Sequence, residues 1–361
     1  MATLKVYTDR IIQNVKKLNS FLGAEDIEWS LVTKMLNGNK SILEKILLDE
    51  SIEKVHSIAD SRLSNLKVIK KINPKLVTMY IKPPAPSLAK SIVEFADISM
   101  NSSLETIEVL NEEAMRQDVI HKIIVMIEMG ELREGVLRDN VLRFYDKVFN
   151  LSNIDIIGIG TNLGCMYGIE PTYDKLIQLS LYEQLIEAKF GHNLQIVSGG
   201  SSITLPYSLE QKLPKGANHF RIGEAAFLGV SPLNNKKFKN LSTNALEFKA
   251  EILEIEKKSY SPDGIVGDGN IGHISDKVDE ADPYAESYRA IVDFGVLDVE
   301  VDNLISKNKN ISYFGTTSDM TVYDLGNSKS KIKVGHKLKF TPNYMAAARL
   351  LNSKYVEIEV V

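Results

Sequence analysis

Short apolar runs alternate with longer amphipathic stretches over the first two thirds of the chain. Eight of the runs have the length and composition of buried strands: 28–33, 55–59, 75–81, 96–100, 121–128, 154–160, 194–198 and 217–222. The stretches between them follow a helical period, as in 62–72, where Leu63, Leu66 and Ile69 share one helix face. The other stretches of this kind are 39–48, 103–116, 138–150 and 172–190, and 8–21 precedes the first strand. Strands separated by helices predict βαβ units and therefore a parallel sheet.

Eight such units are the number that closes a (β/α)8 barrel, and this TIM-type α/β barrel is the fold class that the pattern favours. A doubly wound open sheet has the same alternation and stays as an alternative. After Gly229 the chain becomes polar and loop-like, and then rich in strands, with runs at 246–257, 288–295, 311–314, 320–325, 336–341 and 354–360. We predict a barrel domain over 1–235 and an all-β domain over 236–361, with which the first few residues can pair.

Composition narrows the class of protein. Lys and Arg number 43 against 47 Asp and Glu in 361 residues, for a net charge of −4. No basic footprint for nucleic acid or an acidic membrane is present, and no apolar run reaches the roughly 18 residues of a membrane span. Cys165 is the single cysteine, which excludes intrachain disulfides and Cys-rich zinc sites and favours a reducing compartment. We therefore expect a cytoplasmic protein with no nucleic-acid or membrane partner.

The strand ends carry the candidate chemistry, because a barrel places its active site at the carboxyl ends of its strands. Lys34 follows the first strand. A lysine that loses hydration at the mouth is a nucleophile for Schiff-base chemistry, and an ordinary solvated lysine is the alternative. Strand seven runs into Ser198-Gly199-Gly200-Ser201-Ser202, and strand eight runs into Arg221-Ile222-Gly223-Glu224 at the start of an expected helix. Amides and hydroxyls in these two loops suit phosphate oxygens. A reactive lysine beside a phosphate cradle suggests pyridoxal 5′-phosphate (PLP) as the cofactor.

Other polar residues have less specific signals. Asp60 and Glu128 follow strands two and five, and each can be a solvated loop residue or half of an ion pair. Arg133 lies close enough to the expected mouth to receive a substrate carboxylate or the hydroxyl of a cofactor. His219 precedes Arg221 on a buried strand, so we expect it in the core, and we expect Cys165 to be a structural thiol.

Nine segments spread over nearly the whole chain carry a family pattern: VTKMLNGN (32–39), ADSRLSNL (59–66), ADISMNSSLETI (96–107), MIEMGELREG (126–135), GIGTNLGC (158–165), IVSGGSS (196–202), HFRIGEAAFLG (219–229), RAIVDFGVLDV (289–299) and TTSDMTVYDL (316–325). They resemble the alanine/ornithine racemase family of fold-type III PLP enzymes, and most of all its ornithine-racemase-like branch. The resemblance implies a homodimer in which the β domain of one subunit closes the active site of the other.

The resemblance also implies roles for individual residues. Lys34 would hold the cofactor covalently and act as one acid/base, while Arg221 would face the pyridine nitrogen. Groups that would hold the phosphate are the backbone amides of Gly223 and Glu224 and the hydroxyls of Ser202 and Tyr344. Asn162 would lie against the cofactor ring, and Arg133 would lie near its phenolic oxygen.

The departures from the family pattern concern the second half of the mechanism. Racemisation needs acid/base groups on both faces of the substrate Cα, and Lys34 serves only one. Alanine racemases have a tyrosine in a Gly-Tyr-x-Asp turn, where this chain reads Gly295-Val296-Leu297-Asp298. The ornithine-racemase-like branch has Asp-His where this chain has Asp319-Met320. We name Asp298 and Asp319 as candidates for the second acid/base; His273, Cys165 and a water molecule are further ones.

The function that we expect is PLP-dependent amino-acid racemisation by a homodimer with shared active sites. A lyase, aldolase or decarboxylase on the same cofactor needs only one proton-transfer face and stays open, as do a non-catalytic PLP carrier and a barrel without a cofactor. The sequence does not identify the substrate. The apolar Val296, Leu297 and Met320 point away from ornithine, whose side-chain ammonium calls for an acidic partner.

Overall fold

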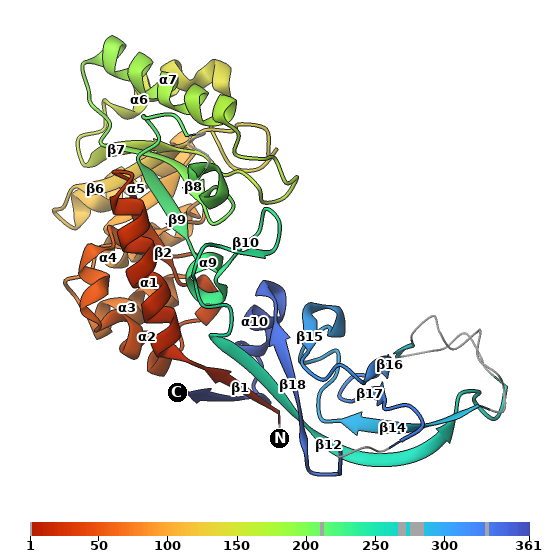
Figure 1. The fold of residues 1–361 in the computed structure, drawn as a ribbon. Coiled ribbons are helices and arrows are strands. Elements are labelled where there is room, and N and C mark those ends of the chain that lie inside the picture. Colours follow the sequence, from red (N-terminus) through yellow and green to blue (C-terminus); the bar gives the residue numbers. More distant parts are fainter. Residues whose placement is uncertain (1, 210–212, 266–271, 275–284, 329–331) are drawn as a thin grey trace. The chain divides into compact units, whose positions relative to one another are not determined.

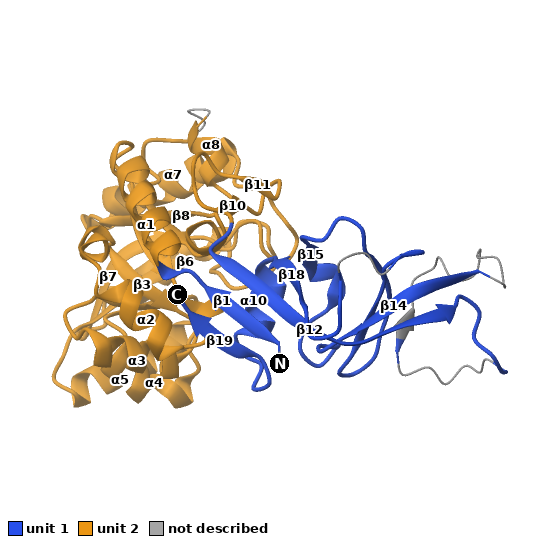
Figure 2. Ribbon diagram, turned by 60° about the horizontal axis from the view of Figure 1, so that its bottom comes forward, with its two compact units in different colours: residues 1–8, 244–361 blue, residues 9–243 orange. Residues whose placement is uncertain are grey.

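The computed structural model describes residues 2–209, 213–265, 272–274, 285–328 and 332–361 (Figure 1). The chain divides into two compact units (Figure 2). Residues 9–243 form the barrel unit, and residues 1–8 together with 244–361 form the β unit. The segment 236–243, which the sequence-based boundary assigns to the second domain, belongs to the barrel unit, where Phe238 and Leu241 are buried.

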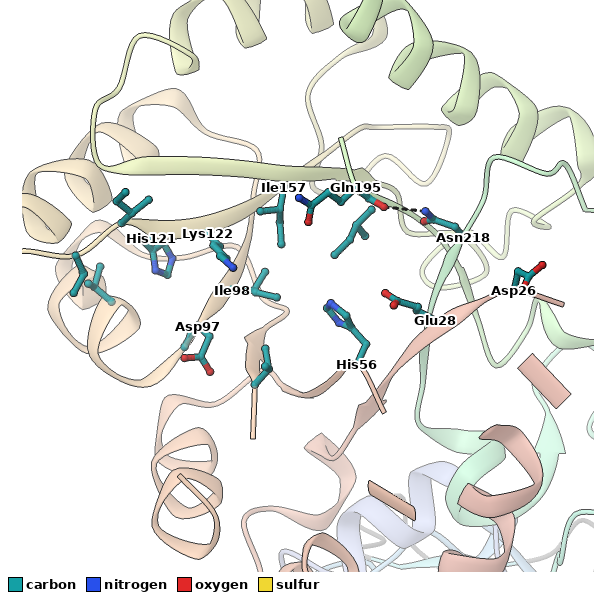
Figure 3. A pocket seen from close by; sticks show the side chains of 16 residues that line it. Asp26, Glu28, His56, Asp97, Ile98, His121, Lys122, Ile157, Gln195 and Asn218 are labelled. Carbon is teal, nitrogen blue, oxygen red and sulfur yellow. Dashed lines mark hydrogen bonds between the residues drawn. The ribbon is translucent and has the colours of Figure 1, made fainter. Parts of the chain in front are cut away.

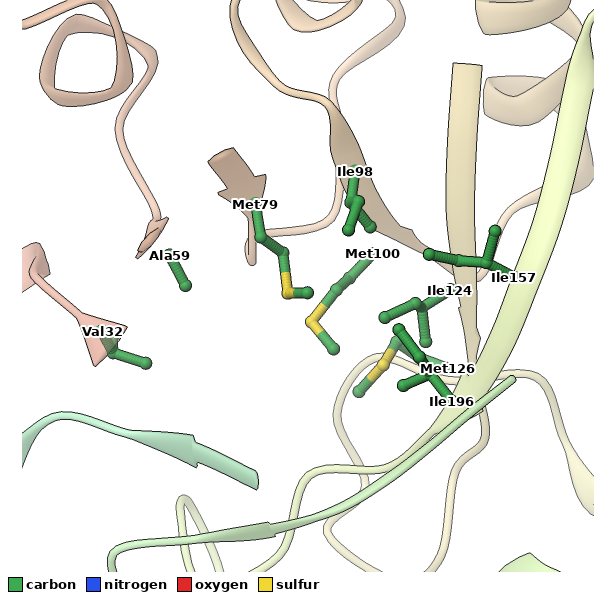
Figure 4. Close-up of a cluster of buried hydrophobic side chains, with 9 residues drawn as sticks. All are labelled: Val32, Ala59, Met79, Ile98, Met100, Ile124, Met126, Ile157 and Ile196. Carbon is green, nitrogen blue, oxygen red and sulfur yellow. The ribbon is translucent and has the colours of Figure 1, made fainter. Parts of the chain in front are cut away.

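The barrel unit contains eight parallel strands that close on themselves, which confirms the (β/α)8 prediction and excludes the open sheet. In chain order they are β2 (Glu28–Val32), β3 (Ser57–Asp60), β4 (Thr78–Tyr80), β5 (Ile98–Asn101), β6 (His121–Met126), β7 (Ile154–Gly160), β8 (Ile196–Ser201) and β9 (His219–Ile222). Apolar side chains from seven of these strands form a buried cluster of Val32, Ala59, Met79, Ile98, Met100, Ile124, Met126, Ile157 and Ile196 (Figure 4). Each of the eight apolar runs predicted between residues 28 and 222 therefore contains a barrel strand.

Helices alternate with these strands. They are α1 (Thr8–Gly23), α2 (Lys40–Leu47), α3 (Leu63–Ile72), α4 (Ala89–Phe95), α5 (Leu104–Arg116), α6 (Val141–Val148), α7 (Tyr173–Phe190), α8 (Leu205–Leu209) and α9 (Glu224–Leu228). Short 3-10 turns lie at η1 (Lys34–Leu36), η2 (Glu50–Lys54), η3 (Pro86–Leu88) and η4 (Arg138–Asn140). The side chains of Asn39 and Ser103 cap α2 and α5, because an oxygen at this position satisfies a free backbone N–H. The sequence pattern missed α4, whose seven residues are too few to set a clear period.

The β unit is built on β12 (Leu246–Ser259), whose alternating burial reflects one face packed inward and one face toward solvent. Its other strands are β1 (Thr3–Val6), β13 (His273–Ile274), β14 (Glu286–Val292), β15 (Leu304–Ser306), β16 (Ser312–Thr316), β17 (Thr321–Asp324), β18 (Lys337–Pro342) and β19 (Glu357–Val360). The order along the sheet is β13-β16-β17-β14-β12-β1-β19, and β18 pairs with both β12 and β15. The first residues of the chain thus form a strand between β12 and β19. Aromatic side chains fill the core, with the rings of Phe248 and Phe294 centred 5.3 Å apart.

Four short elements of the β unit were not expected from the sequence, and two of them are the strands β13 and β15. Helix α10 (Tyr344–Leu350) follows β18, and the 3-10 turn η6 (Val301–Asn303) precedes β15. Asn343 caps α10 by accepting a hydrogen bond from the backbone N–H of Ala346. Two strands in the barrel unit, β10 (Val230–Ser231) and β11 (Lys236–Lys237), form a small hairpin after α9. Within the described ranges, no helix combines the length and the apolar character needed to cross a bilayer.

Candidate active site

Three neighbouring strand ends bring the predicted cofactor residues to one rim of the barrel. Strand β9 lies between β8 and β2, with Arg221 level with Ser201 on one side and with Ser30 on the other. The loops that follow these three strands begin at Ser202, Gly223 and Thr33. Because parallel strands all end at the same edge, Lys34 and the two proposed phosphate loops lie on the same rim.

Lys34 is the first residue of η1, directly after β2. Its side chain is exposed in this single chain, and the expected loss of hydration stays a prediction for the protein with its cofactor bound. The residue before it, Thr33, is buried and donates a 2.9 Å hydrogen bond from Oγ1 to Oδ2 of Asp60. A second hydrogen bond, 2.9 Å long, runs from the backbone N–H of Arg62 to Oδ1 of the same carboxylate. Burial raises the pKa of Asp60. Asp60 is therefore a buried group that fixes the turn carrying Lys34, and not a solvated loop residue.

The proposed phosphate loops have the donors that an anion needs. Ser202 is buried, and its Oγ accepts a 3.1 Å hydrogen bond from the backbone N–H of Ala225, which leaves its own proton available to donate. Within the described chain, the backbone N–H groups of Gly223 and Glu224 donate to no acceptor. A Cβ on Gly223 would lie 3.0 Å from the carbonyl oxygen of Val32, so glycine permits β9 to end this close to β2.

Glu224 adds a charge that responds to its surroundings. Burial raises the pKa of its carboxyl to about 7, and the nearby ammonium group of Lys34 opposes this increase. The two side chains are thus electrostatic neighbours on the rim. An amine, free backbone N–H groups and a serine hydroxyl together fit PLP, which carries an aldehyde and a phosphate. Tyr344, the remaining proposed phosphate ligand, is the first residue of α10 in the β unit.

Arg221 is buried, with 7% of its surface exposed, and its guanidinium is held from two sides. Nη1 donates to the backbone oxygen of Ser198 at 2.9 Å and also to the Ser198 hydroxyl. Nη2 donates to the backbone oxygen of Thr161 at 2.7 Å and to Oδ1 of Asn162 at 2.8 Å. Burial lowers the pKa of Arg221 to about 10, so the group stays protonated at neutral pH and presents a fixed positive charge.

Glu134 is a functional candidate that the sequence reasoning missed. Its carboxylate accepts hydrogen bonds from Nε and Nη2 of Arg133, at 2.5 and 2.6 Å, and from Nδ2 of Asn162. Burial raises the pKa of Glu134, but the hydrogen bonds from Arg133 and Asn162 outweigh burial and bring it below its ordinary value. Arg133, Glu134, Asn162 and Arg221 therefore form one continuous chain. The signal in the sequence was an acidic residue directly after Arg133 in a loop at the mouth.

Glu131 shapes the loop that follows β7. It is 2% exposed and accepts four hydrogen bonds from the backbone N–H groups of Cys165, Met166, Tyr167 and Ile169, between 2.7 and 3.1 Å long. A carboxylate that satisfies four amides in this way is a structural anchor. It holds the loop containing Asn162 and the exposed thiol of Cys165, and it leaves no oxygen for other chemistry.

The two segments that depart from the family pattern lie side by side within the β unit. The backbone N–H groups of Val296 and Leu297 donate to the carbonyl oxygens of Thr317 and Ser318, at 3.0 and 2.9 Å. The Leu297 side chain is 73% exposed and that of Met320 is 38% exposed. The structure therefore brings both unusual segments together on one surface of this unit.

The two candidate acids on this surface have different surroundings. Asp298 accepts a 3.1 Å hydrogen bond from the Ser353 hydroxyl on Oδ1, and Oδ2 lies 3.4 Å from the backbone nitrogen of Gly295. Asp319 is exposed, and within the described ranges its carboxylate accepts hydrogen bonds from the hydroxyls of Thr317 and Ser318. Asp298 thus closes its own turn, whereas Asp319 remains accessible. His273 lies in β13, and its side chain falls outside the described part of the chain.

A cavity of about 790 Å³ lies at the opposite end of the barrel, at the amino-terminal ends of the strands (Figure 3). Glu28, His56, Asp97, His121 and Lys122 are among the residues that line it. Glu28 and His121 are the first residues of β2 and β6, so this cavity is separate from the rim that carries Lys34.

Comparisons with known proteins agree with this geometry. A family model described as "Alanine racemase, N-terminal domain" matches residues 6–232. The ornithine racemase of Acetoanaerobium sticklandii is 31% identical, over 92% of this chain and 92% of its own length. The lysine racemase of Thermotoga maritima is 30% identical, over 98% of this chain and 97% of its own length.

Solved structures share the complete fold. An alanine racemase from Clostridium difficile 630 superimposes with a TM-score of 0.75 at 15% identity, covering 100% of this chain and 95% of its own. A D-threonine aldolase from Filomicrobium marinum has a TM-score of 0.68 at 11% identity, covering 97% of this chain and 88% of its own. The match of the family model over most of the barrel, together with two relatives aligned along nearly their whole length, shows that this chain belongs to the alanine racemase family.

Proposed function

We propose that the protein is a PLP-dependent amino-acid racemase that acts on basic amino acids, with ornithine and lysine as the first candidates. The observation that carries the proposal is the similarity of at least 30% to an ornithine racemase and a lysine racemase, over more than nine tenths of this chain. The rim that gathers Lys34, Arg221 and the free N–H groups of Gly223 and Glu224 supports it. The apolar residues on the β unit that pointed away from ornithine carry less weight than these relatives.

The cofactor, when bound, supplies an electron-accepting ring that lowers the cost of removing the proton from the substrate Cα. Lys34 holds the cofactor and moves a proton at its Nζ on one face of that carbon. Arg221 would face the ring nitrogen as a permanent cation, which would disfavour protonation of that nitrogen and so limit side reactions. Asn162 and Arg133, held by Glu134, orient the ring. Ser202 and the backbone N–H groups of Gly223 and Glu224 would bind the phosphate, and Tyr344 stays a proposed further phosphate ligand.

The second face needs its own acid/base, and we assign this role to Asp319 of a partner subunit in a homodimer. Asp298 is the weaker candidate because Ser353 and Gly295 already occupy its carboxylate. Asp319 is exposed, and among the described residues both of its hydrogen bonds go to Oδ1 from neighbouring hydroxyls, which leaves Oδ2 for proton transfer.

The test is to incubate the holoenzyme with single enantiomers of ornithine and lysine in deuterated water. We expect loss of optical purity together with deuterium at Cα. Exchange with strict retention of configuration on every basic amino acid would contradict racemisation. Release of an aldehyde or carbon dioxide would instead favour a lyase. This second candidate has a specific basis, because a D-threonine aldolase shares the fold and needs only one proton-transfer face.

A further inference from the structure

A row of buried polar side chains crosses the interior of the barrel beneath Arg221. Ser198, His219, Ser30 and Ser57 come from β8, β9, β2 and β3, and each is at most 2% exposed. The imidazole of His219 lies between two hydroxyls, with Nδ1 2.8 Å from Ser198 Oγ and Nε2 2.9 Å from Ser30 Oγ. The expectation that His219 lies in the core is therefore confirmed, but its two nitrogens are engaged in hydrogen bonds.

The hydrogen bonds of the row define one direction. The Nη1 group of Arg221 can only donate, so Ser198 Oγ accepts from it. The Ser198 hydroxyl proton then has His219 Nδ1 as its acceptor. If Nδ1 carried the proton instead, the Ser198 hydroxyl proton would be left without an acceptor in a buried site, which is costly. His219 is thus assigned the tautomer with its proton on Nε2.

The same direction continues to the far end of the barrel. The Nε2–H group of His219 donates to Ser30 Oγ. The Ser30 hydroxyl in turn donates to Ser57 Oγ, 2.6 Å away. Ser57 in turn lies 3.3 Å from Nδ1 of His56, a residue of the cavity at the opposite end. Every hydroxyl proton in the row has an acceptor, and such a chain of hydrogen bonds is mutually reinforcing.

The charge of His219 fits this arrangement. Burial lowers the pKa of His219 well below its ordinary value, and the neighbouring His56 and Arg221 lower it further. The rings of His56 and His219 are centred 5.0 Å apart. When His219 is neutral, Arg221 is the cation at this end of the row. The unprotonated Nδ1 of His219 accepts the hydroxyl proton of Ser198, so the lone pairs of that hydroxyl point toward the guanidinium of Arg221.

We propose that His219 is a positioning residue for Arg221: neutral His219 orients the Ser198 hydroxyl, and that hydroxyl fixes the guanidinium that faces the cofactor ring. The proposal rests on the proposed function in one respect, because it takes Arg221 to be the partner of the ring nitrogen. It adds that the geometry of this contact is set by two residues that do not touch the cofactor.

Two substitutions separate this role from mere filling of space. In His219→Asn the side-chain oxygen can take the place of Nδ1 and accept from Ser198, although the residue is much smaller. In His219→Gln the side chain is closer to histidine in size, but its amide reaches toward Ser30 rather than Ser198. If His219 only fills space, the Gln variant should bind PLP more tightly than the Asn variant. If His219 positions Ser198, the Asn variant should bind PLP more tightly. Ser198→Ala removes the intermediate hydroxyl directly.

The first measurement is the dissociation constant of PLP, obtained by absorbance titration of the full-length wild type and variants. We expect about a tenfold weakening in His219→Gln and in Ser198→Ala, the size of one lost hydrogen bond, and less than about a threefold change in His219→Asn. The double variant His219→Gln/Ser198→Ala should be no weaker than Ser198→Ala, because both changes break one path. Equal weakening by Asn and Gln, or additive effects, would overturn the proposal.

The second measurement is neutron diffraction from crystals of the deuterated wild-type protein, which locates protons without any variant. Density for deuterium on Nε2 of His219, with none on Nδ1, supports the proposal, and deuterium on Nδ1 overturns it. The two failures are distinguishable. If the wild type binds no PLP, the proposed function fails, whereas tight PLP binding with deuterium on Nδ1 refutes only the positioning role of His219.

Discussion

The rim of the barrel and the paired turns of the β unit are built in opposite ways. On the rim, Arg221, Asn162 and Glu134 are joined to one another by hydrogen bonds and are largely shielded from water. On the turns, Leu297 and Met320 are exposed, and in the described part of the chain Asp319 accepts hydrogen bonds from the hydroxyls of the nearby Thr317 and Ser318. The rim also carries the family pattern, whereas the turns are where that pattern is lost.

The difference teaches which of the two regions tolerates substitution. A side chain that must hold a cofactor is fixed by partners within its own unit, so replacing it leaves buried groups without hydrogen bonds. A side chain on an exposed turn has no such partners and can change at little cost in stability. We therefore expect substitutions of the hydrogen-bonded rim residues Arg221, Asn162 and Glu134 to affect both binding and folding, and substitutions of the exposed Asp319 to affect the reaction alone.

The largest effect is expected from Lys34→Ala. Among the described residues the side chain of Lys34 has no hydrogen-bond partner, so the protein should fold normally, while racemisation falls by on the order of 10³-fold. The measurement is the racemisation rate together with the visible absorbance band of the bound cofactor, which should also be lost. Lys40→Ala, an exposed lysine that pairs with Glu44 at 3.3 Å, is the control. Retained activity in Lys34→Ala would remove the rim from the chemistry.

The next effect tests the turns. Asp319→Asn should slow racemisation by about a hundredfold. PLP affinity and the unfolding midpoint should stay unchanged, because the carboxylate accepts hydrogen bonds from exposed hydroxyls that water can replace.

Asp298→Asn should instead lower stability and leave racemisation nearly unchanged. It loosens the turn that Gly295 and Ser353 close and lowers the free energy of unfolding by about 1 kcal/mol. Single-enantiomer exchange in deuterated water distinguishes the two. If Asp298→Asn alone stops inversion, the assignment of the second acid/base is reversed.

The same contrast explains what could be predicted from the sequence. The eight strands and most of the helices follow from apolar periodicity, because each strand is buried and each helix has one buried face. Lys34, Ser202 and Arg221 could be found because strand ends of a barrel have a known role. Glu134 was missed, because the acidic residue after Arg133 is a weak signal by itself and its hydrogen bond with Asn162, which is distant in sequence, forms only in the fold.

The surroundings of Asp60 could not be predicted either. A solvated loop residue or half of an ion pair was expected, because the sequence does not show that the hydroxyl of Thr33 turns toward Asp60. The strand end was located correctly, but the direction of this side chain depends on a local turn that the alternation of polar and apolar residues does not encode.

A smaller effect is expected from Glu134→Gln, which tests whether the rim acts as one network. The neutral amide cannot accept two charged hydrogen bonds from Arg133, and its NH2 group faces donors. We expect a loss of about 2 kcal/mol in the free energy of unfolding and PLP affinity weakened by about tenfold. Urea unfolding and absorbance titration measure the two quantities. Glu187→Gln, an exposed residue of α7, is the control, and a result no larger than the control would mean that the chain from Arg133 to Arg221 is not cooperative.

The smallest effect concerns Glu224, whose ionisation should be linked to folding. Burial raises the pKa of Glu224 from 4.5 to about 7, so the folded protein binds this proton more tightly than the unfolded chain does. Stability is therefore lost as the pH rises through this interval. The interval corresponds to at most about 3 kcal/mol, and partial exposure reduces this to about 1 to 2 kcal/mol. Urea unfolding at about pH 5 and about pH 8 should show this loss in the wild type and in Asp319→Asn, but not in Glu224→Gln. An equal pH dependence in all three proteins would show that the rim does not hold Glu224 in the buried state that separates it from the exposed turns.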